Sequence, residues 1–161
     1  MHDVEVLARK FRNAIDAAIR EGDPVISKDA CFSRFPIGCC GDACDLLGQF
    51  LLDHNIRTYY VCGTYRDGVF ENTQSHAWLL TEEDVIIDIT GDQFHTDSNF
   101  LCYNYRVYYG KEDDFHKLFD VGYFDIYEYK GLVEFDLFAQ IRLVGLYRKI
   151  CEYLEYPSFK E

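Results

Sequence analysis

SHAWLLTEEDVIIDIT, residues 75–90, contains two short apolar runs that are separated by the polar segment TEED. Runs rich in β-branched and aromatic residues, with turn residues between them, predict an antiparallel hairpin. Side chains alternate between the two faces of a strand, so His76 and Trp78 share one face. With a turn centred on Glu82, His76 lies directly opposite Asp88. The hairpin therefore brings an imidazole within reach of a carboxylate.

This pair has two interpretations. Both side chains are costly to bury unless they hydrogen-bond each other, so a satisfied structural pair is one of them. The other is a general base that is oriented by a carboxylate, as in the triad of a nucleophilic enzyme. Trp78, the single tryptophan of the chain, follows two residues after the histidine and would form a wall of such a site.

A candidate nucleophile lies upstream, in FPIGCCGDACDLLGQFLLDHN, residues 35–55. Gly38 and Gly41 flank Cys39 and Cys40, where a tight turn leads into an apolar helical pattern. A thiol at a helix N-terminus faces unpaired backbone N–H groups and the positive end of the helix dipole, which favour the thiolate. The same N–H groups would hold the oxyanion of an acyl-transfer intermediate. A buried cysteine that only packs is the alternative.

The rest of the chain predicts an α+β domain. Apolar residues at helical spacing indicate helices at residues 3–21, 40–54 and 132–154, with a loop at 23–39. Runs typical of strands occupy residues 58–62, 75–80, 85–89, 99–109 and 121–129. We found no repeat or linker in the sequence, so we expect one domain over residues 1–161, with N-terminal helices packed on a mainly antiparallel sheet and a C-terminal helix.

The composition narrows the class of function. With 28 acidic against 16 basic residues, the net charge is −12, which argues against a nucleic-acid partner and against an anionic membrane surface. The first residues lack the uncharged apolar core of a signal peptide, and no apolar run approaches the length of a membrane span. Seven cysteines without a regular framework indicate free thiols in a reducing compartment. We expect the protein to be cytoplasmic, and the sequence leaves open whether it is injected into a host cell.

Metal binding and partner binding are the rival interpretations. The sequence has no paired C-x-x-C elements, and His54, His95 and His116 show no spacing relation to the cysteines, so we expect no metal and no cofactor. Cys44, one turn into the helix, is interpreted as a packing residue. The acidic stretch KEDDFHKLFD, residues 111–120, would suit a binding or immunity-type protein that lacks activity. Thiol reactivity would separate the two classes, because a binding module needs no activated cysteine.

Three short motifs in this order resemble the transglutaminase-like branch of the papain-like cysteine enzymes. They are GCCGDA at residues 38–43, SHAW at 75–78 and IDIT at 87–90. The resemblance spans about residues 35–94 and implies a papain-like core with Cys40 as nucleophile, His76 as base and then acid, and Asp88 as the orienting residue.

The resemblance also implies an activity. Members of this superfamily include peptidases, amidases, deamidases and acyl transferases, so it implies a cysteine hydrolase or acyltransferase that cleaves an amide bond of a protein or peptide substrate. Cys39 is the alternative nucleophile. The papain pattern has a glutamine before the cysteine that is missing here, and Gln93, in GDQF, is a candidate for the second oxyanion donor by its closeness to Asp88 in the sequence. The substrate and the oligomeric state stay open.

Overall fold

The computed structural model describes residues 3–66 and 73–156. Its α-helices are α1 (Val4–Arg20), α2 (Pro24–Ser27), α3 (Cys40–Asp53) and α4 (Leu137–Glu152). Its strands are β1 (Tyr59–Arg66), β2 (Thr73–Leu80), β3 (Ile86–Asp88), β4 (Tyr108–Gly110) and β5 (Ile126–Glu128). Short 3₁₀ helices are η1 (Phe32–Arg34), η2 (Gly91–Phe94), η3 (Ser98–Phe100), η4 (His116–Leu118), η5 (Tyr123–Asp125) and η6 (Leu132–Glu134).

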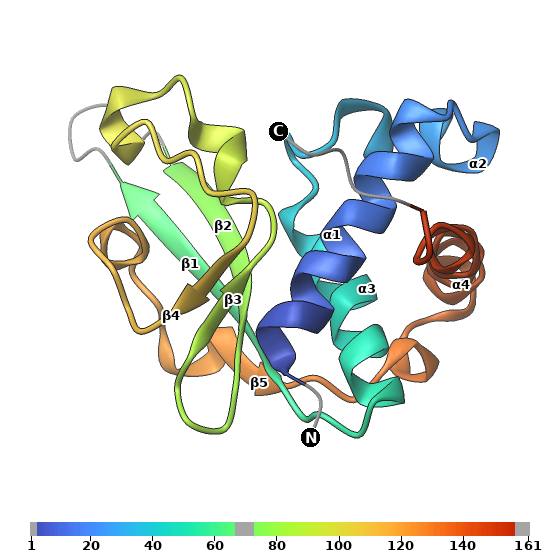
Figure 1. Cartoon of the computed structure of the whole chain (residues 1–161). Helices are drawn as coiled ribbons and strands as arrows, with labels where there is room; N and C mark the ends of the chain where they lie inside the picture. Colours follow the sequence, from blue (N-terminus) through green and yellow to red (C-terminus); the bar gives the residue numbers. More distant parts are fainter. Residues whose placement is uncertain (1–2, 67–72, 157–161) are drawn as a thin grey trace.

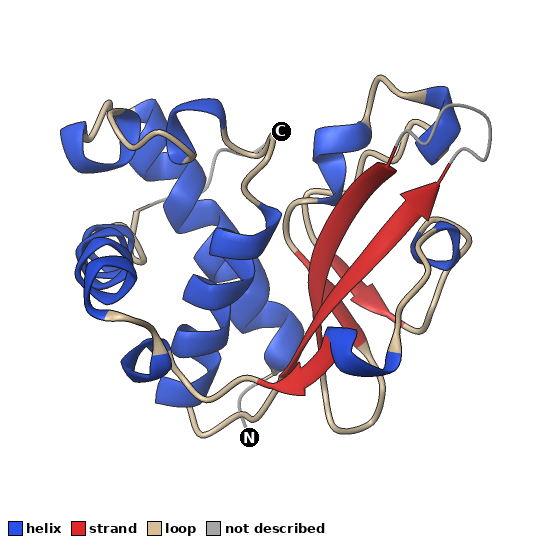
Figure 2. Ribbon diagram, turned by 180° about the vertical axis from the view of Figure 1, so that it is seen from behind, coloured by secondary structure: helices blue, strands red, loops and turns tan. Residues whose placement is uncertain are grey.

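The strands form an antiparallel sheet in the order β4-β3-β2-β1-β5, and the α-helices lie on one side of it (Figures 1 and 2). The α+β class and the antiparallel sheet are therefore confirmed. Among the described residues, no helix combines the length and the apolar character that a membrane crossing requires.

The first long helices form where their apolar period predicts them. α1 begins after Asp3, whose carboxylate accepts a hydrogen bond from the Glu5 amide at 2.9 Å and so satisfies an unpaired donor of the first turn. Its buried face contains Phe11 and Ile15, both 0% exposed. The predicted C-terminal helix is shorter than expected, because residues 132–134 form a 3₁₀ turn and Asp136 caps α4.

Two expectations about irregular segments were wrong. The predicted loop at 23–39 contains helical turns, α2 and η1. The strand predicted for residues 99–109 exists only from Tyr108 onward. Leu101 and Cys102 have φ values of 61° and 48°, which an extended strand does not allow. The aromatic residues that suggested a strand fill a cluster from a loop instead.

The hairpin of β2 and β3 has a register two residues away from the predicted one. Leu79 pairs with Ile87, and the amide of Thr81 donates to the carbonyl of Val85 at 2.9 Å. This pairing centres the loop on Glu83. The last residue of the loop, Asp84, has a φ of 59°, the left-handed conformation that is typical of a three-residue hairpin loop. A shift of two residues keeps every side chain on its predicted face. His76 and Asp88 are thus diagonal neighbours on one face.

Two clusters of buried side chains lie on the two faces of the sheet. The helical cluster joins α1, α3 and α4 to Ala77, Leu79 and Ile87 of the sheet. The aromatic cluster lies on the opposite face, from which Trp78 and Ile86 project. Its members are Val61, Trp78, Ile86, Phe94, Phe100, Tyr103, Phe115 and Phe119.

Candidate functional site

Cys40 is the first residue of α3 and is half-buried. Burial opposes ionisation of its thiol, but the hydrogen bond and charge of His76 and the backbone amide of Ala77 outweigh burial and lower the pKa of Cys40. The position at a helix N-terminus acts in the same direction. The thiolate at this residue therefore has stabilising partners from both α3 and β2.

The neighbouring cysteines have the opposite character. The Cys39 thiol is buried, donates to the carbonyl of Cys31 at 2.9 Å and lies 3.1 Å from the Cys31 sulfur. Burial, followed by the interaction with Cys31, raises the pKa of Cys39. Burial also raises the pKa of Cys44 well above its ordinary value, in agreement with a packing role. Of the three thiols at this end of α3, Cys40 is the one whose surroundings favour the thiolate.

His76 and Asp88 are in contact in the interior of the protein. The Nε2 atom of His76 lies 2.7 Å from Oδ2 of Asp88, and the two side chains are 0% and 1% exposed. Burial disfavours the imidazolium, but the charge and hydrogen bond of Asp88, with further help from Cys40, raise the pKa of His76 to about 9. Burial would raise the pKa of Asp88, whereas the charge of His76 and hydrogen bonds from His116 and His76 hold that pKa well below its usual range. The geometry therefore favours the charged forms of both groups.

Gln93 lies beside the other ring nitrogen of His76. Its Nε2 atom is 3.4 Å from His76 Nδ1 and donates to the Thr90 carbonyl at 3.1 Å, while its Oε1 atom accepts from the Gly38 amide at 3.3 Å. Gln93 thereby links η2 to the turn that precedes Cys40. The side-chain amide of Gln93, which the sequence suggested as an oxyanion donor, thus lies next to His76. Its second N–H proton is not used in the bond to Thr90.

Arg12 of α1 holds the segment that follows Asp88. The guanidinium is 4% exposed and donates to the Ile89 carbonyl at 2.7 Å. It also donates to the two carboxylate oxygens of Asp92, at 2.9 Å each. Bidentate, charge-assisted bonds of this kind fix geometry strongly. Through them, the N-terminal helix positions Asp88 and η2.

Trp78 contacts the site from the interior. Its ring centroid lies 5.8 Å from that of His76 and 4.9 Å from that of His116, and the residue is 4% exposed. Trp78 therefore packs behind the histidine within the aromatic cluster. Its predicted contact with substrate remains a prediction.

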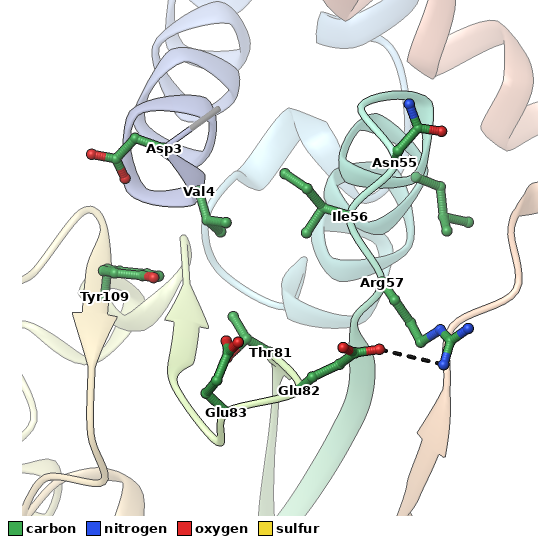
Figure 3. A pocket seen from close by; sticks show the side chains of 10 residues that line it. Asp3, Val4, Asn55, Ile56, Arg57, Thr81, Glu82, Glu83 and Tyr109 are labelled. Atoms are coloured by element: carbon green, nitrogen blue, oxygen red, sulfur yellow. Dashed lines mark ion pairs between the residues drawn. The ribbon is translucent and has the colours of Figure 1, made fainter. Parts of the chain in front are cut away.

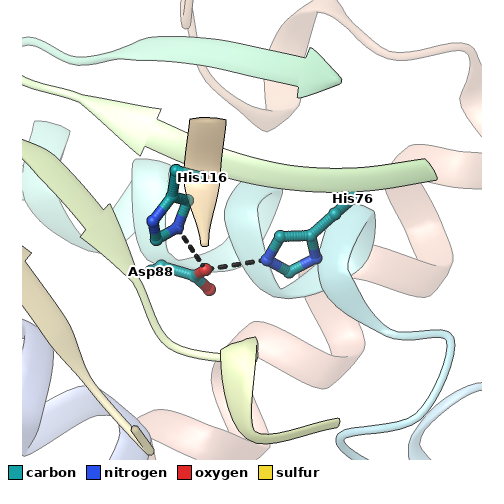
Figure 4. A group of neighbouring side chains, drawn as sticks. All are labelled: His76, Asp88 and His116. Atoms are coloured by element: carbon teal, nitrogen blue, oxygen red, sulfur yellow. Dashed lines mark hydrogen bonds and ion pairs between the residues drawn. The ribbon is translucent and has the colours of Figure 1, made fainter. Parts of the chain in front are cut away.

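Sequence reasoning missed His116. Its Nε2 atom lies 2.8 Å from Oδ2 of Asp88, the same oxygen that contacts His76 (Figure 4). Its Nδ1 atom lies 2.6 Å from Oδ1 of Asp113. The rival interpretation took the stretch 111–120 as a partner surface, but Phe115, His116 and Phe119 within it are buried. The spacing of Asp113 and His116, at i and i+3 on one turn, was the available signal.

His76, Asp88 and His116 also form a group of the kind that binds metals, because an oxygen and two Nε2 atoms converge. In a tetrahedral site with bonds of about 2.0–2.1 Å, ligand atoms lie roughly 3.3 Å apart. Here each nitrogen is at hydrogen-bonding distance from the oxygen, 2.7 and 2.8 Å. Figure 4 shows the carboxylate oxygen between the two rings, where an ion would have to lie. The arrangement fits a hydrogen-bonded cluster better than a ligand set.

A large hollow, of about 880 Å³, lies elsewhere (Figure 3). It is lined by Asp3, Val4, Leu52, Asn55, Ile56, Arg57, Thr81, Glu82, Glu83 and Tyr109, and it contains an ion pair of 3.3 Å between Arg57 and Glu82. Leu52 and Asn55 mark the C-terminal end of α3, whereas Cys40 begins it. At 1.5 Å per residue, the 14 residues of α3 span about 21 Å, so this hollow is not part of the site around Cys40.

Comparisons with protein-family models, with curated proteins and with solved structures find no match to this chain. The interpretation of the site therefore depends on its own geometry and chemistry.

Proposed function

We propose that this protein is a cysteine hydrolase or acyltransferase of the transglutaminase-like, papain-like type, acting on an amide bond of a protein or peptide. Cys40 is the nucleophile, His76 the acid and base, and Asp88 the residue that orients His76. The observation that carries the proposal is the position of Cys40 at the first residue of α3, beside a histidine that Asp88 holds at 2.7 Å and that lowers the pKa of the thiol. A thiolate paired with an oriented imidazolium is the activated nucleophile of such enzymes.

The geometry supports a division of labour between the two nitrogens of His76. Nε2–H donates to Asp88, which leaves Nδ1 to face Gln93 and the thiol of Cys40. This assignment of protons follows from the hydrogen-bond partners. The ring can then transfer a proton at Nδ1 without losing its orientation.

The reaction proceeds through a thioester. The sulfur of Cys40 bonds to the carbonyl carbon, the C–N bond breaks, and His76 gives its Nδ1 proton to the leaving nitrogen. Water or an amine then attacks the thioester while His76 takes up its proton, and cleavage of the C–S bond restores the thiolate. The backbone N–H of Cys40 and the side-chain amide of Gln93 are the donors for the oxyanion.

Limiting iodoacetamide near pH 6.5, followed by peptide mapping, tests the proposal. Cys40 should be alkylated first, because it combines a helix N-terminus with a neighbouring imidazolium. His76→Ala should slow its alkylation by roughly tenfold or more, which corresponds to about one pKa unit.

Cys44→Ala is the matched control, because Cys44 lies on the same helix. This substitution should leave the alkylation of Cys40 largely unchanged. Preferential alkylation of Cys39 would move the nucleophile by one residue. Slow, uniform alkylation of every thiol, unaffected by His76→Ala, would overturn the enzyme proposal in favour of a binding protein.

A further inference from the structure

His116 is buried with a carboxylate at each of its ring nitrogens. Oδ2 of Asp88 lies 2.8 Å from Nε2, and Oδ1 of Asp113 lies 2.6 Å from Nδ1. A neutral imidazole carries a single N–H, so one nitrogen lone pair would then face a carboxylate oxygen. Only the imidazolium can donate to both.

The two carboxylates already have donors at their remaining positions. Oδ1 of Asp88 accepts from the Thr90 amide at 3.0 Å. Oδ2 of Asp113 accepts from the Tyr103 hydroxyl at 2.7 Å, and its Oδ1 accepts from the His116 amide at 2.8 Å. Hydrogen bonds that donate to a carboxylate stabilise its ionised form, so these donors disfavour a proton on either carboxyl group. The geometry therefore favours two carboxylates and a cationic His116.

We infer that His116 is a positioning residue, held as an imidazolium between Asp88 and Asp113, which shares the carboxylate of Asp88 with His76 and so sets the pH window of the Cys40–His76 pair. The charge of His116 follows from the contacts alone. Its effect on the thiol rests on the proposed function.

The surroundings of His116 contain few other charges. The rings of Trp78 and Phe115 lie 4.9 Å from it, and those of Tyr108 and Tyr103 lie 5.4 and 5.8 Å away. Burial is the first cause that raises the pKa of Tyr103 and of Tyr108, so both hydroxyls are neutral near pH 7. Within residues 3–66 and 73–156, the charged groups that face His116 are thus Asp88, Asp113 and His76.

The sign of the effect follows from the charges. Loss of the His116 cation leaves the whole negative charge of Asp88 to His76 and Cys40, which raises the pKa of both. The ring centroids of His76 and His116 are 6.3 Å apart. At that separation and an effective dielectric constant of about 20, one charge shifts a pKa by about 1–2 units. The whole pH window therefore moves upward.

Two measurements test the inference. In the wild-type protein, histidine ¹⁵N NMR should show His116 protonated at both nitrogens from about pH 5 to above pH 7. In parallel, the NMR titration of His76 should move upward by about 1–2 pH units in His116→Gln, and the pH profile for alkylation of Cys40 should move in the same direction.

Asp113→Asn provides a second route should His116→Gln fail to fold. It removes the carboxylate that holds the Nδ1 proton, so the pKa of His116 falls. Because the negative charge of Asp113 is lost together with the nearer cation of His116, an upward shift smaller than that in His116→Gln is expected. Tyr103→Phe is the control, because it removes a hydrogen bond to Asp113 but no charge, and it should leave both titrations within about 0.3 unit of wild type.

A neutral His116 at pH 7, or titrations that stay in place or move downward in the variants, would overturn the inference. One equivalent of zinc retained by the purified protein would also overturn it, since metal-bound imidazoles are neutral. If His116 is cationic but Cys40 shows no preferential alkylation, the charge assignment stands and the proposed function fails.

Discussion

The two faces of the sheet are packed with different kinds of side chain. The helical cluster is built largely from alanine, leucine and isoleucine of α1, α3 and α4. The opposite face is covered by aromatic rings, and the His76–Asp88–His116 group lies among them. The ring of Phe94, for example, meets His76 edge to face at 5.2 Å. The helical face supplies apolar burial, whereas the aromatic face combines burial with partners for charged groups.

This difference has a physical reason. Aliphatic side chains offer no electrostatic partner, so a charge buried among them would be unpaired and costly. Aromatic rings exclude water equally well, but they carry a negative face and a positive edge. The negative face can accommodate an imidazolium. Exclusion of water also strengthens the bonds of both histidines to Asp88. Substitutions on the aromatic face should therefore change pKa values, and those on the helical face should change stability alone.

The largest effect is expected for Asp88→Asn. This change leaves His76 and His116 without the anion that they share, and breaking a buried charge network in this way costs about 3–5 kcal/mol. The free energy of unfolding by urea should fall by that amount. The pKa of His76 should fall as well, opposite to its shift in His116→Gln.

Asp114→Asn, at an exposed position of the same segment as His116, is the control and should change stability by less than about 0.5 kcal/mol. A stable Asp88→Asn variant with an unchanged His76 titration would show that Asp88 does not support the imidazolium.

A cavity on the helical face should have the next largest effect. Leu146 of α4 is 2% exposed and belongs to the helical cluster. Leu146→Ala should lower the free energy of unfolding by about 2–5 kcal/mol, because it loses apolar contacts and leaves a cavity. The pH profile for alkylation of Cys40 should stay in place. A shifted profile would show that the two faces are coupled and would break the comparison.

The sequence predicted the elements whose signal is local. Val4–Arg20 and Cys40–Asp53 follow a regular apolar period and form helices there. The contact between His76 and Asp88 was predicted although the register was not, because a shift of two residues preserves the face of each strand. Patterns of this kind depend on neighbours within a few turns or one hairpin.

The rest depends on contacts over long distances in the chain. His116 reaches Asp88 across 28 residues, from a 3₁₀ turn that follows an irregular segment. No periodicity connects the two. Aromatic residues near Tyr103 suggested a strand because a ring has a similar propensity for a strand and for a buried loop. Only the assembled cluster distinguishes these possibilities.

The pH dependence of stability offers a finer test, and its sign follows from the directions of the pKa shifts. The raised pKa of His76 and the lowered pKa of Cys40 act in opposite directions above about pH 6.5. The folded histidine keeps a proton that the unfolded histidine loses, whereas the folded thiol gives up a proton that the unfolded thiol keeps, so the two contributions compensate at least in part. His116 has no such compensation. Hydrogen bonds to Asp113 and Asp88 outweigh burial and raise its pKa, so its contribution is complete below about pH 6.5 and is lost as pH rises through the folded value.

We therefore expect the free energy of unfolding to decline above about pH 6.5, and His116 should contribute at most about 1.4 kcal/mol per pH unit to the slope, the value for one proton. Urea unfolding at pH 5.5, 6.5, 7.5 and 8.5 measures it. His116→Gln should flatten the decline, because glutamine binds no proton in either state. Leu146→Ala should lower the curve without changing its slope, since it removes volume and no charge. If both variants kept the wild-type slope, the titrating group would lie outside the aromatic face, and the division between a stabilising face and a charge-bearing face would be wrong.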